Sequence, residues 1–245
     1  MEESGVSLVD APRRVALFGG SFDPPHWGHL AVAKAARAAL RLDSVLFAPV
    51  GTQPLKPQGA AASFEQRLAM THLAIAGEPA FSVSLADEPK TNAAPNYTWA
   101  TLQAVRAELP ANTQLFFLMG ADSLAGFRRW HRANEIPFIA SLVVASRPGE
   151  RMDDLKALFP SGLRIEPAPN ALPASNGAGG QLRTYSLRSP AGDSAPFYLL
   201  PDVEVEVSAS QIREQIREPD LFNAQVAMNL PIPVLEYIRS NKLYL

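Results

Sequence analysis

The sequence of 245 residues contains no cysteine. This absence excludes disulfide bonds, a thiol nucleophile and a zinc site built on thiolates, and it is compatible with a reducing cytoplasm. Long apolar runs are also missing, since no stretch reaches the roughly 18 consecutive apolar residues that span a membrane. The acidic start, Met-Glu-Glu-Ser, lacks the positive charge and apolar core of a secretory signal. We therefore expect a cytoplasmic protein with no membrane partner.

An excess of basic charge is a third absence. Lys and Arg total 22 against 24 Asp and Glu, which gives a formal net charge of −2. Proteins that bind nucleic acid carry a basic footprint, so we expect no nucleic-acid partner, and any phosphate site must be local. A hydrophobic content of 47% is enough for a sizeable core. We predict a single domain over residues 1–245, with a loose N-terminus at 1–12.

The most distinctive stretch of the sequence follows its first apolar run. Arg14–Phe18 is typical of a buried strand in a parallel sheet. We expect Gly19 and Gly20 to end this strand, to take backbone angles closed to other residues and to leave main-chain N–H groups open to a ligand. Pro24-Pro25 suits the first positions of a helix, which predicts a helix from about His26 to Leu40.

Two histidines lie at the start of this predicted helix. His26 and His29 are three residues apart, so they share one face of the first turn, where the helix dipole and unpaired N–H groups favour an anion. Gly28 leaves room for a flat group such as a base. A metal site made of Asp23 and the two histidines has no fourth ligand nearby. Glycines or histidines taken singly can be structural, but their joint occurrence favours a phosphate site.

Apolar strands and helices alternate along the rest of the chain, which predicts an α/β fold with a Rossmann-like, doubly wound parallel sheet. Expected strands are 45–50, 81–84, 114–119, 141–145 and 203–207, and expected helices are 63–77, 98–109 and 231–238. The segment from about 159 to 194 is rich in Pro, Gly, Ser and Ala. It predicts an insertion, with a hairpin formed by 182–187 and 197–200.

The helix that begins after residue 63 has its own expected arrangement. Phe64, Leu68 and Ile75 have the spacing of a buried face, whereas Arg67 is expected at the surface. A capping box of Ser63 and the glutamine three residues later should open this helix.

Three further positions can be structural, and two of them also have a ligand-binding interpretation. Asp122 follows a central strand, where it either accepts hydrogen bonds from ribose hydroxyls or caps the next helix. Trp130 lies outside any apolar run and is either a packed anchor or a stacking surface for an aromatic ligand. Thr98 opens a helix and can be its N-cap alone.

A second helix N-terminus is expected near residue 208. Ser208, Ser210 and Arg213 bring two hydroxyls and a guanidinium to its first turn, although Ser208 can be an N-cap alone. Two anion sites at two strand–helix junctions imply an extended polyphosphate between them. Lys56, in the loop after the second strand, either reaches a phosphate or is simply solvated.

Residues 19–29, Gly-Gly-Ser-Phe-Asp-Pro-Pro-His-Trp-Gly-His, resemble the GGxFDPxHxGH signature of the nucleotidylyltransferase superfamily, and most closely that of bacterial nicotinate-nucleotide adenylyltransferases. Ser208–Arg213 resembles the ISxxxIR box of that family, with Val207 in place of isoleucine. Leu55 stands where the family has histidine, so only Lys56 is carried over from that loop. The resemblance covers nearly the whole chain.

The resemblance implies three groups of site residues. His26, His29 and Arg213 would be catalytic, and His131 stands where many relatives have tyrosine. ATP would be bound by Gly19, Gly20, Ser21, Phe22, His26, Gly28, His29, Lys56, Asp122, Ser208, Ser210 and Arg213. Nicotinate mononucleotide would be bound by Tyr97, Thr98, Trp130 and His131, with the indole stacked on the pyridine ring. No residue is assigned to a metal, because Mg²⁺ would be bound mainly through the ATP phosphates.

The implied reaction is adenylyl transfer from ATP to nicotinate mononucleotide, giving nicotinate adenine dinucleotide and pyrophosphate in NAD biosynthesis. ATP and nicotinate mononucleotide are then the partners, and a homo-oligomer is left open. Two alternatives remain. The acceptor can instead be nicotinamide mononucleotide or phosphopantetheine, or the protein can be a nucleotide-binding regulator without turnover.

Overall fold

The computed structural model describes residues 13–55, 59–92, 94–146, 155–168, 182–201, 203, 207–217 and 225–245. Its strands are β1 (Arg14–Gly20), β2 (Ser44–Pro49), β3 (Phe81–Val83), β4 (Gln114–Gly120), β5 (Ser141–Ala145), β6 (Arg164–Pro167), β7 (Arg183–Arg188) and β8 (Ser194–Leu200). Its helices are α1 (Trp27–Leu40), α2 (Phe64–Ile75), α3 (Thr98–Glu108), α4 (Ala121–Ala125), the 3₁₀ turn η1 (Phe127–Arg129), α5 (Ile136–Ile139), α6 (Leu155–Leu158), α7 (Ala209–Arg217), α8 (Gln225–Asn229) and α9 (Ile232–Ser240).

All of the described strands belong to one sheet, in the order β3-β2-β1-β4-β5-β8-β7-β6. The strands from β3 to β8 pair in parallel, and β7 and β6 extend the sheet in antiparallel fashion. β1 lies between β2 and β4, with Leu17 level with Leu46 and Phe117. The predicted Rossmann-like α/β sheet is therefore confirmed.

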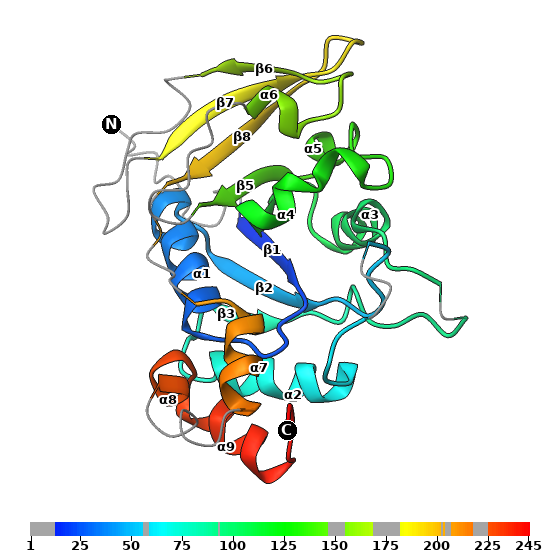
Figure 1. Ribbon diagram of the computed structural model, residues 1–245. Helices are drawn as coiled ribbons and strands as arrows, with labels where there is room; N and C mark the ends of the chain where they lie inside the picture. The colour runs from blue at the N-terminus through cyan, green and yellow to red at the C-terminus, as the bar shows by residue number, and fades with distance from the viewer. Residues whose placement is uncertain are drawn as a thin grey trace, which may run out of the picture.

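Helices cover both faces of this sheet, so each central strand is buried on both sides. Alternate residues of β1 point to opposite faces: Ala16 and Phe18 join one buried cluster, and Leu17 joins another. The first cluster is closed by α1, α2 and the C-terminal helices, and the second by α3 and α5. Figure 1 shows α1 on one side of the sheet and α3 on the other. The doubly wound arrangement explains why these strands read as continuous apolar runs.

The predicted hairpin is confirmed, because β7 and β8 pair in antiparallel register with Tyr185 opposite Phe197. β6 and β7 lie within the predicted insertion. The strand expected over 203–207 falls mostly on residues outside the described ones, and the two described residues, Val203 and Val207, belong to no strand. No helix of the described chain is long and apolar enough to cross a membrane.

The capping box at the start of α2 is confirmed, but the helix turns a different face to the core than predicted. The Gln66 N–H donates to Ser63 Oγ at 3.2 Å, and the Ser63 N–H donates to Gln66 Oε1 at 2.9 Å. Ile75 is buried as expected. Phe64 and Leu68 are only half-buried. The buried stripe is made of Arg67, Met70, Thr71, Ala74 and Ile75.

The surface position predicted for Arg67 is therefore wrong, since this side chain is only 2% exposed. Its guanidinium donates to the Ser21 carbonyl at 2.7 Å and to the Val50 carbonyl at 2.8 Å. These carbonyls lie just beyond the ends of β1 and β2, where the ladder no longer pairs them. Burial lowers the pKa of Arg67, while Asp23 opposes that shift. The arginine ties together the chain segments that leave two neighbouring strands.

Candidate active site

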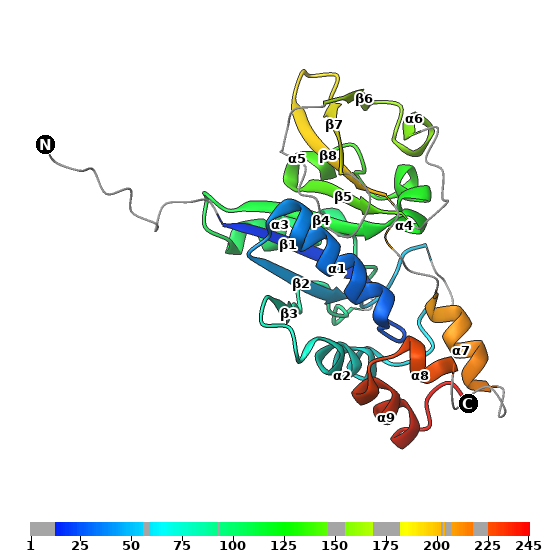
Figure 2. The same cartoon turned by 90° about the vertical axis from the view of Figure 1, so that its left-hand side faces the viewer.

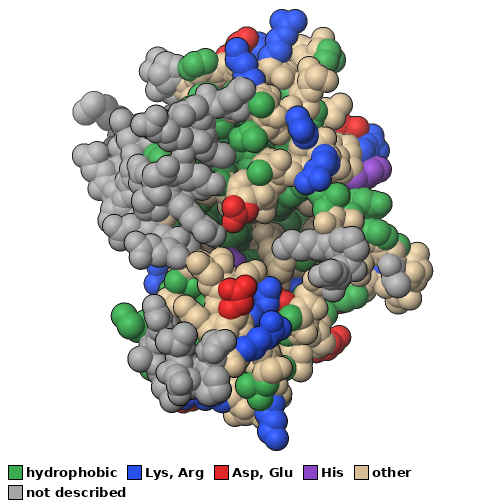
Figure 3. Space-filling model, viewed as in Figure 1, with side chains coloured by type: hydrophobic (Ala, Val, Ile, Leu, Met, Phe, Trp, Pro, Cys, Tyr) green, Lys and Arg blue, Asp and Glu red, His purple; other side chains and the backbone are tan. Residues whose placement is uncertain are grey.

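A cavity of about 1060 Å³ lies at the carboxyl ends of the central strands, where ligands bind in open α/β sheets. Every predicted site residue within the described chain lines it. These residues are Gly19, Gly20, Ser21, Phe22, His26, Gly28, His29, Tyr97, Thr98, Asp122, Trp130, His131, Ser208, Ser210 and Arg213. Lys56 lies outside the described residues. Figure 3 shows this face hollowed at its middle, with acidic and basic side chains beside the hollow.

The two glycines differ from the prediction in their place in the strand and in their backbone angles. Gly19 and Gly20 are the last residues of β1 rather than its stop, and neither has a positive φ. A Cβ on Gly19 would lie 3.1 Å from the Phe117 ring, and one on Gly20 would lie 3.0 Å from the Phe22 ring. The missing side chains therefore make room for two aromatic rings of the cavity floor. The left-handed backbone belongs to Phe22, with φ 48°.

The first turn of α1 holds His26 and His29 in a reciprocal cap. The Gly28 N–H donates to His26 Nδ1 at 3.1 Å, and the His26 N–H donates to His29 Nδ1 at 3.2 Å. The two ring centroids are 3.9 Å apart. Because each Nδ1 accepts from the backbone, the ring proton of each neutral imidazole resides on Nε2. His26 is thus the N-cap of the helix, and the Nδ1 atom of each histidine is engaged by the backbone.

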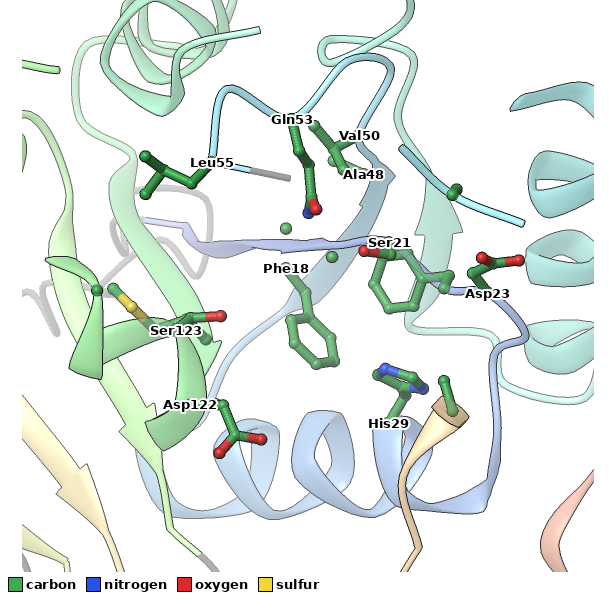
Figure 4. A pocket seen from close by; sticks show the side chains of 18 of the residues that line it. Phe18, Ser21, Asp23, His29, Ala48, Val50, Gln53, Leu55, Asp122 and Ser123 are labelled. Carbon is green, nitrogen blue, oxygen red and sulfur yellow. The ribbon is translucent and has the colours of Figure 1, made fainter. Parts of the chain in front are cut away.

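Packing fixes the His29 ring in the cavity. Its centroid lies 4.9 Å from that of Phe22, and Figure 4 shows the ring rising from α1 toward the hollow. Burial, and secondarily the electrostatic effect of the neighbouring His26, lowers the pKa of His29 well below 6.5. Before ligand binds, His29 is therefore a neutral hydrogen-bond donor.

A second helix N-terminus lies against the first. Ser208 caps α7, because its Oγ accepts from the Gln211 N–H at 3.2 Å. Arg213 Nη2 donates to Ser210 Oγ at 3.2 Å, and Nη1 donates to the Asp23 carbonyl at 2.7 Å. The arginine thus joins α7 to the loop before α1. Two helix N-termini, two imidazoles and a guanidinium line the same cavity, and such a set of donors suits an anion.

The Asp23 carboxylate is already used within the protein. It accepts from the N–H groups of Ala61 and Ala62 at 2.6 and 3.1 Å and from the Tyr244 hydroxyl at 2.7 Å. In Figure 4 it points away from the His29 ring. Within the described residues, no group of three or more His, Cys, Asp or Glu side chains could hold a metal ion.

An aromatic wall forms the other end of the cavity. The Tyr97 and His131 rings lie 4.6 Å apart. Trp130 is half-buried and packs on Phe127 at 5.5 Å and on Phe117 at 6.1 Å. It is therefore a packed anchor that still presents surface to the cavity. A flat ring has an aromatic surface to stack on here.

Two capping interpretations are wrong at this end of the site. Tyr97, not Thr98, is the N-cap of α3, and it makes no side-chain cap. The N-cap of α4 is Gly120, so Asp122 lies inside that helix, where its exposed side chain borders the cavity. α3 begins one residue earlier than a Thr98 cap would require, and α4 begins two residues earlier than an Asp122 cap would require.

A network of buried polar groups behind the aromatic wall was not predicted. Asn96 Oδ1 accepts from the Thr52 N–H at 2.9 Å, and its amide donates to the carbonyls of Asp87 and Glu88. Thr101 Oγ1 donates to Asp87 Oδ1 at 2.7 Å. Burial raises the pKa of Asp87. No local signal marks these residues, because they come from loops and a helix that are separated in the sequence.

The class of protein follows from comparison with known families. Residues 17–215 match the model of the cytidylyltransferase-like family. A protein of Roseiflexus sp., named "Probable nicotinate-nucleotide adenylyltransferase", is 39% identical over 194 residues, covering 78% of this chain and 92% of its own. One of the same name from Thermomicrobium roseum is 35% identical over 231 residues, covering 94% and 91%. The chain belongs to the nicotinate-nucleotide adenylyltransferase family of nucleotidyltransferases.

Solved structures support the fold. The Plasmodium falciparum nicotinic acid mononucleotide adenylyltransferase complexed with NaAD superposes with a TM-score of 0.64, covering 95% of this chain and 97% of that one at 15% identity. At that identity the likeness concerns the fold alone.

Proposed function

We propose that this protein transfers the adenylyl group of ATP to nicotinate mononucleotide in NAD biosynthesis. The 5′-phosphate oxygen of the mononucleotide forms a bond to the α-phosphorus of ATP. The bond between that phosphorus and the oxygen bridging to the β-phosphate breaks, and pyrophosphate leaves. The observation that carries the proposal is the convergence of two helix N-termini, α1 and α7, on one cavity that ends in an aromatic wall.

The histidine pair is suited to the α- and β-phosphates. His26 and His29 would each donate Nε2–H to the triphosphate while the capping bonds keep both rings in place. A reaction of this kind needs little covalent help, so positioning and charge neutralisation supply most of the rate. Gly19, Gly20 and Ser21 would contribute backbone, and Asp122 would accept from ribose hydroxyls.

The departing pyrophosphate would be held by α7. Ser210, Arg213 and the N–H groups of the first turn face the cavity from that side, and the guanidinium is held by two hydrogen bonds within the protein. Ser208 would contribute less than its hydroxyl suggests, because its Oγ already caps the helix. A guanidinium that is already held in position can bind phosphate without rearranging.

The aromatic wall would receive the acceptor. Trp130 and His131 would stack with the pyridine ring, and the backbone at Tyr97 and Thr98 would bind its carboxylate at the start of α3. We expect Trp130→Ala to raise the KM for nicotinate mononucleotide about ten-fold and to leave the KM for ATP unchanged.

The donor groups of the site fit a metal that enters with the nucleotide. The described chain offers no cluster of metal-ligating side chains, and the Asp23 carboxylate is turned toward backbone N–H groups. Mg²⁺ would be held by phosphate oxygens and water, and when bound it supplies neutralisation of the phosphate charge. The cytoplasmic location, the single-domain organisation and any homo-oligomer stay predictions.

The function is tested by magnesium-dependent pyrophosphate release from ATP, with nicotinate mononucleotide, nicotinamide mononucleotide and phosphopantetheine offered separately to the full chain. The proposal expects strong preference for the nicotinate nucleotide. Preference for another acceptor would overturn the assignment of the aromatic wall. ATP binding without release for any acceptor would overturn the transfer reaction itself.

A further inference from the structure

The last residues of the chain fold back onto the loop that precedes the histidine pair. α9 ends at Ser240, and Lys242 and Tyr244 both take left-handed backbone angles, with φ 51° and 66°. Such angles cost conformational energy for residues with side chains, so surrounding contacts must hold them. Tyr244 is 9% exposed, and its hydroxyl donates to Asp23 Oδ1 at 2.7 Å across 221 residues of sequence. In Figure 2 the C-terminus lies beside α7.

Asp23 is the point where four segments meet. It is 3% exposed, and besides the tyrosine hydroxyl it accepts from the backbone N–H groups of Ala61 and Ala62. Its carboxylate lies 3.9 Å from the Arg213 guanidinium, which also donates to the Asp23 carbonyl. Because both carboxylate oxygens already accept hydrogen bonds from these groups, Asp23 holds the surrounding segments together. A buried carboxylate needs a full set of donors to keep one position.

Tyr244 is a dependable donor for this purpose. Burial, followed by the negative charge of Asp23, raises the pKa of its hydroxyl, so the hydroxyl keeps its proton throughout the working pH range. The hydroxyl and Arg213 thus approach the same carboxylate from the C-terminal tail and from α7.

We propose that Tyr244 is a positioning residue of the nucleotide site: through Asp23 it fixes the direction in which Arg213 presents its guanidinium to the polyphosphate. This rests on the proposed function only in placing the polyphosphate at Arg213. The C-terminal tail is then part of the ATP site, although it lies in a different region of the chain from either anion-binding turn.

The test compares Tyr244→Phe with Tyr237→Phe. Tyr237 lies in the same C-terminal segment, is half-buried, and its hydroxyl makes no hydrogen bond to the described residues. We expect Tyr244→Phe to weaken ATP binding about ten-fold. The effect is measured both as the KM for ATP and by calorimetric titration with magnesium and ATP in the absence of acceptor. The KM for nicotinate mononucleotide should change less than about two-fold, because the acceptor is assigned to the aromatic wall of the cavity. Tyr237→Phe should leave all three unchanged.

A double-mutant cycle separates positioning from a general loss of stability. In an Arg213→Lys background, Tyr244→Phe should weaken ATP binding by less than about two-fold, because the guanidinium that Tyr244 orients is no longer present. An undiminished ten-fold effect in that background, or unchanged ATP affinity in the single variant, would overturn the proposal. If Tyr244→Phe does not fold, Asp23→Asn replaces it in the same cycle with the same expectation. Should the wild-type chain bind ATP but not use nicotinate mononucleotide, the titration still tests Tyr244 while the proposed function fails.

Discussion

Removing His29 should cost the enzyme about 10² to 10³ in turnover, the usual loss when one preorganised donor is deleted. The structure supports the full effect because the ring needs no rearrangement. Its Nδ1 accepts from the His26 N–H at 3.2 Å, and the ring packs 4.9 Å from Phe22 and 3.9 Å from His26. The Nε2–H that remains is therefore directed before the substrate binds. That loss corresponds to roughly 2.7–4 kcal/mol of transition-state stabilisation.

The assay is pyrophosphate release at saturating ATP and nicotinate mononucleotide, with His29→Ala compared to His29→Gln and His72→Ala. The glutamine amide can place an N–H near the lost Nε2 position, so it should recover part of the turnover. His72 is an exposed histidine of α2 and controls for the substitution itself. Unfolding measurements give the stability lost with the helix cap, about 1 kcal/mol, separately from the loss of turnover. Wild-type turnover in His29→Ala would refute the donor role.

Three further outcomes concern stability. Gly51→Ala should lower the free energy of unfolding by roughly 1–3 kcal/mol, because a Cβ there would lie 2.5 Å from the backbone nitrogen of Pro89; Gly77→Ala, with nothing within 4 Å, is the control in urea denaturation. Arg67→Met should cost roughly 2 kcal/mol or more, since it leaves two buried carbonyls unpaired. The pKa of His29 is lower in the folded than in the unfolded chain. Its contribution to the free energy of unfolding is therefore present above pH 6.5 and is lost as the pH falls through the pKa of the folded chain.

Each of these outcomes has a contrary result. If the Gly51→Ala protein is as stable as Gly77→Ala, the loop at Pro89 can move away at no cost, which contradicts the prediction. Arg67→Met should be compared with Arg37→Met on the exposed face of α1, and equal losses would contradict the bridging role. For the pH dependence, unfolding free energies of the wild type should fall more steeply below pH 6.5 than those of His29→Ala, and parallel curves would contradict the shifted pKa.

The sequence predicts the junctions of strand and helix well, because the residues that form them are adjacent in the chain. The strand at Arg14, the capped helix at His26 and the second N-terminus at Ser208 each follow from local pattern and are where they were expected. The apolar run of the strand at Arg14 was enough to predict that both faces of that strand are buried. Local pattern is therefore enough to locate the cavity.

The residues that hold together the segments around the cavity could not be predicted, because their contacts join positions far apart in the sequence. Arg67 looks like a surface residue of an amphipathic helix until two strand ends offer it their carbonyls. Tyr244 meets Asp23 across 221 residues, and no periodicity reports such a contact. Gly19 and Gly20 were recognised as unusual, but the reason for them, two aromatic rings, depends on the tertiary packing.

The most direct test of adenylyl transfer follows the phosphates of ATP. The full chain is supplied with Mg²⁺, nicotinate mononucleotide and ATP labelled at either the α- or the γ-phosphate, and the products are separated. The account predicts that the α label appears in nicotinate adenine dinucleotide and the γ label wholly in pyrophosphate. Transfer of the γ label to the mononucleotide, or its release as inorganic phosphate, would contradict it.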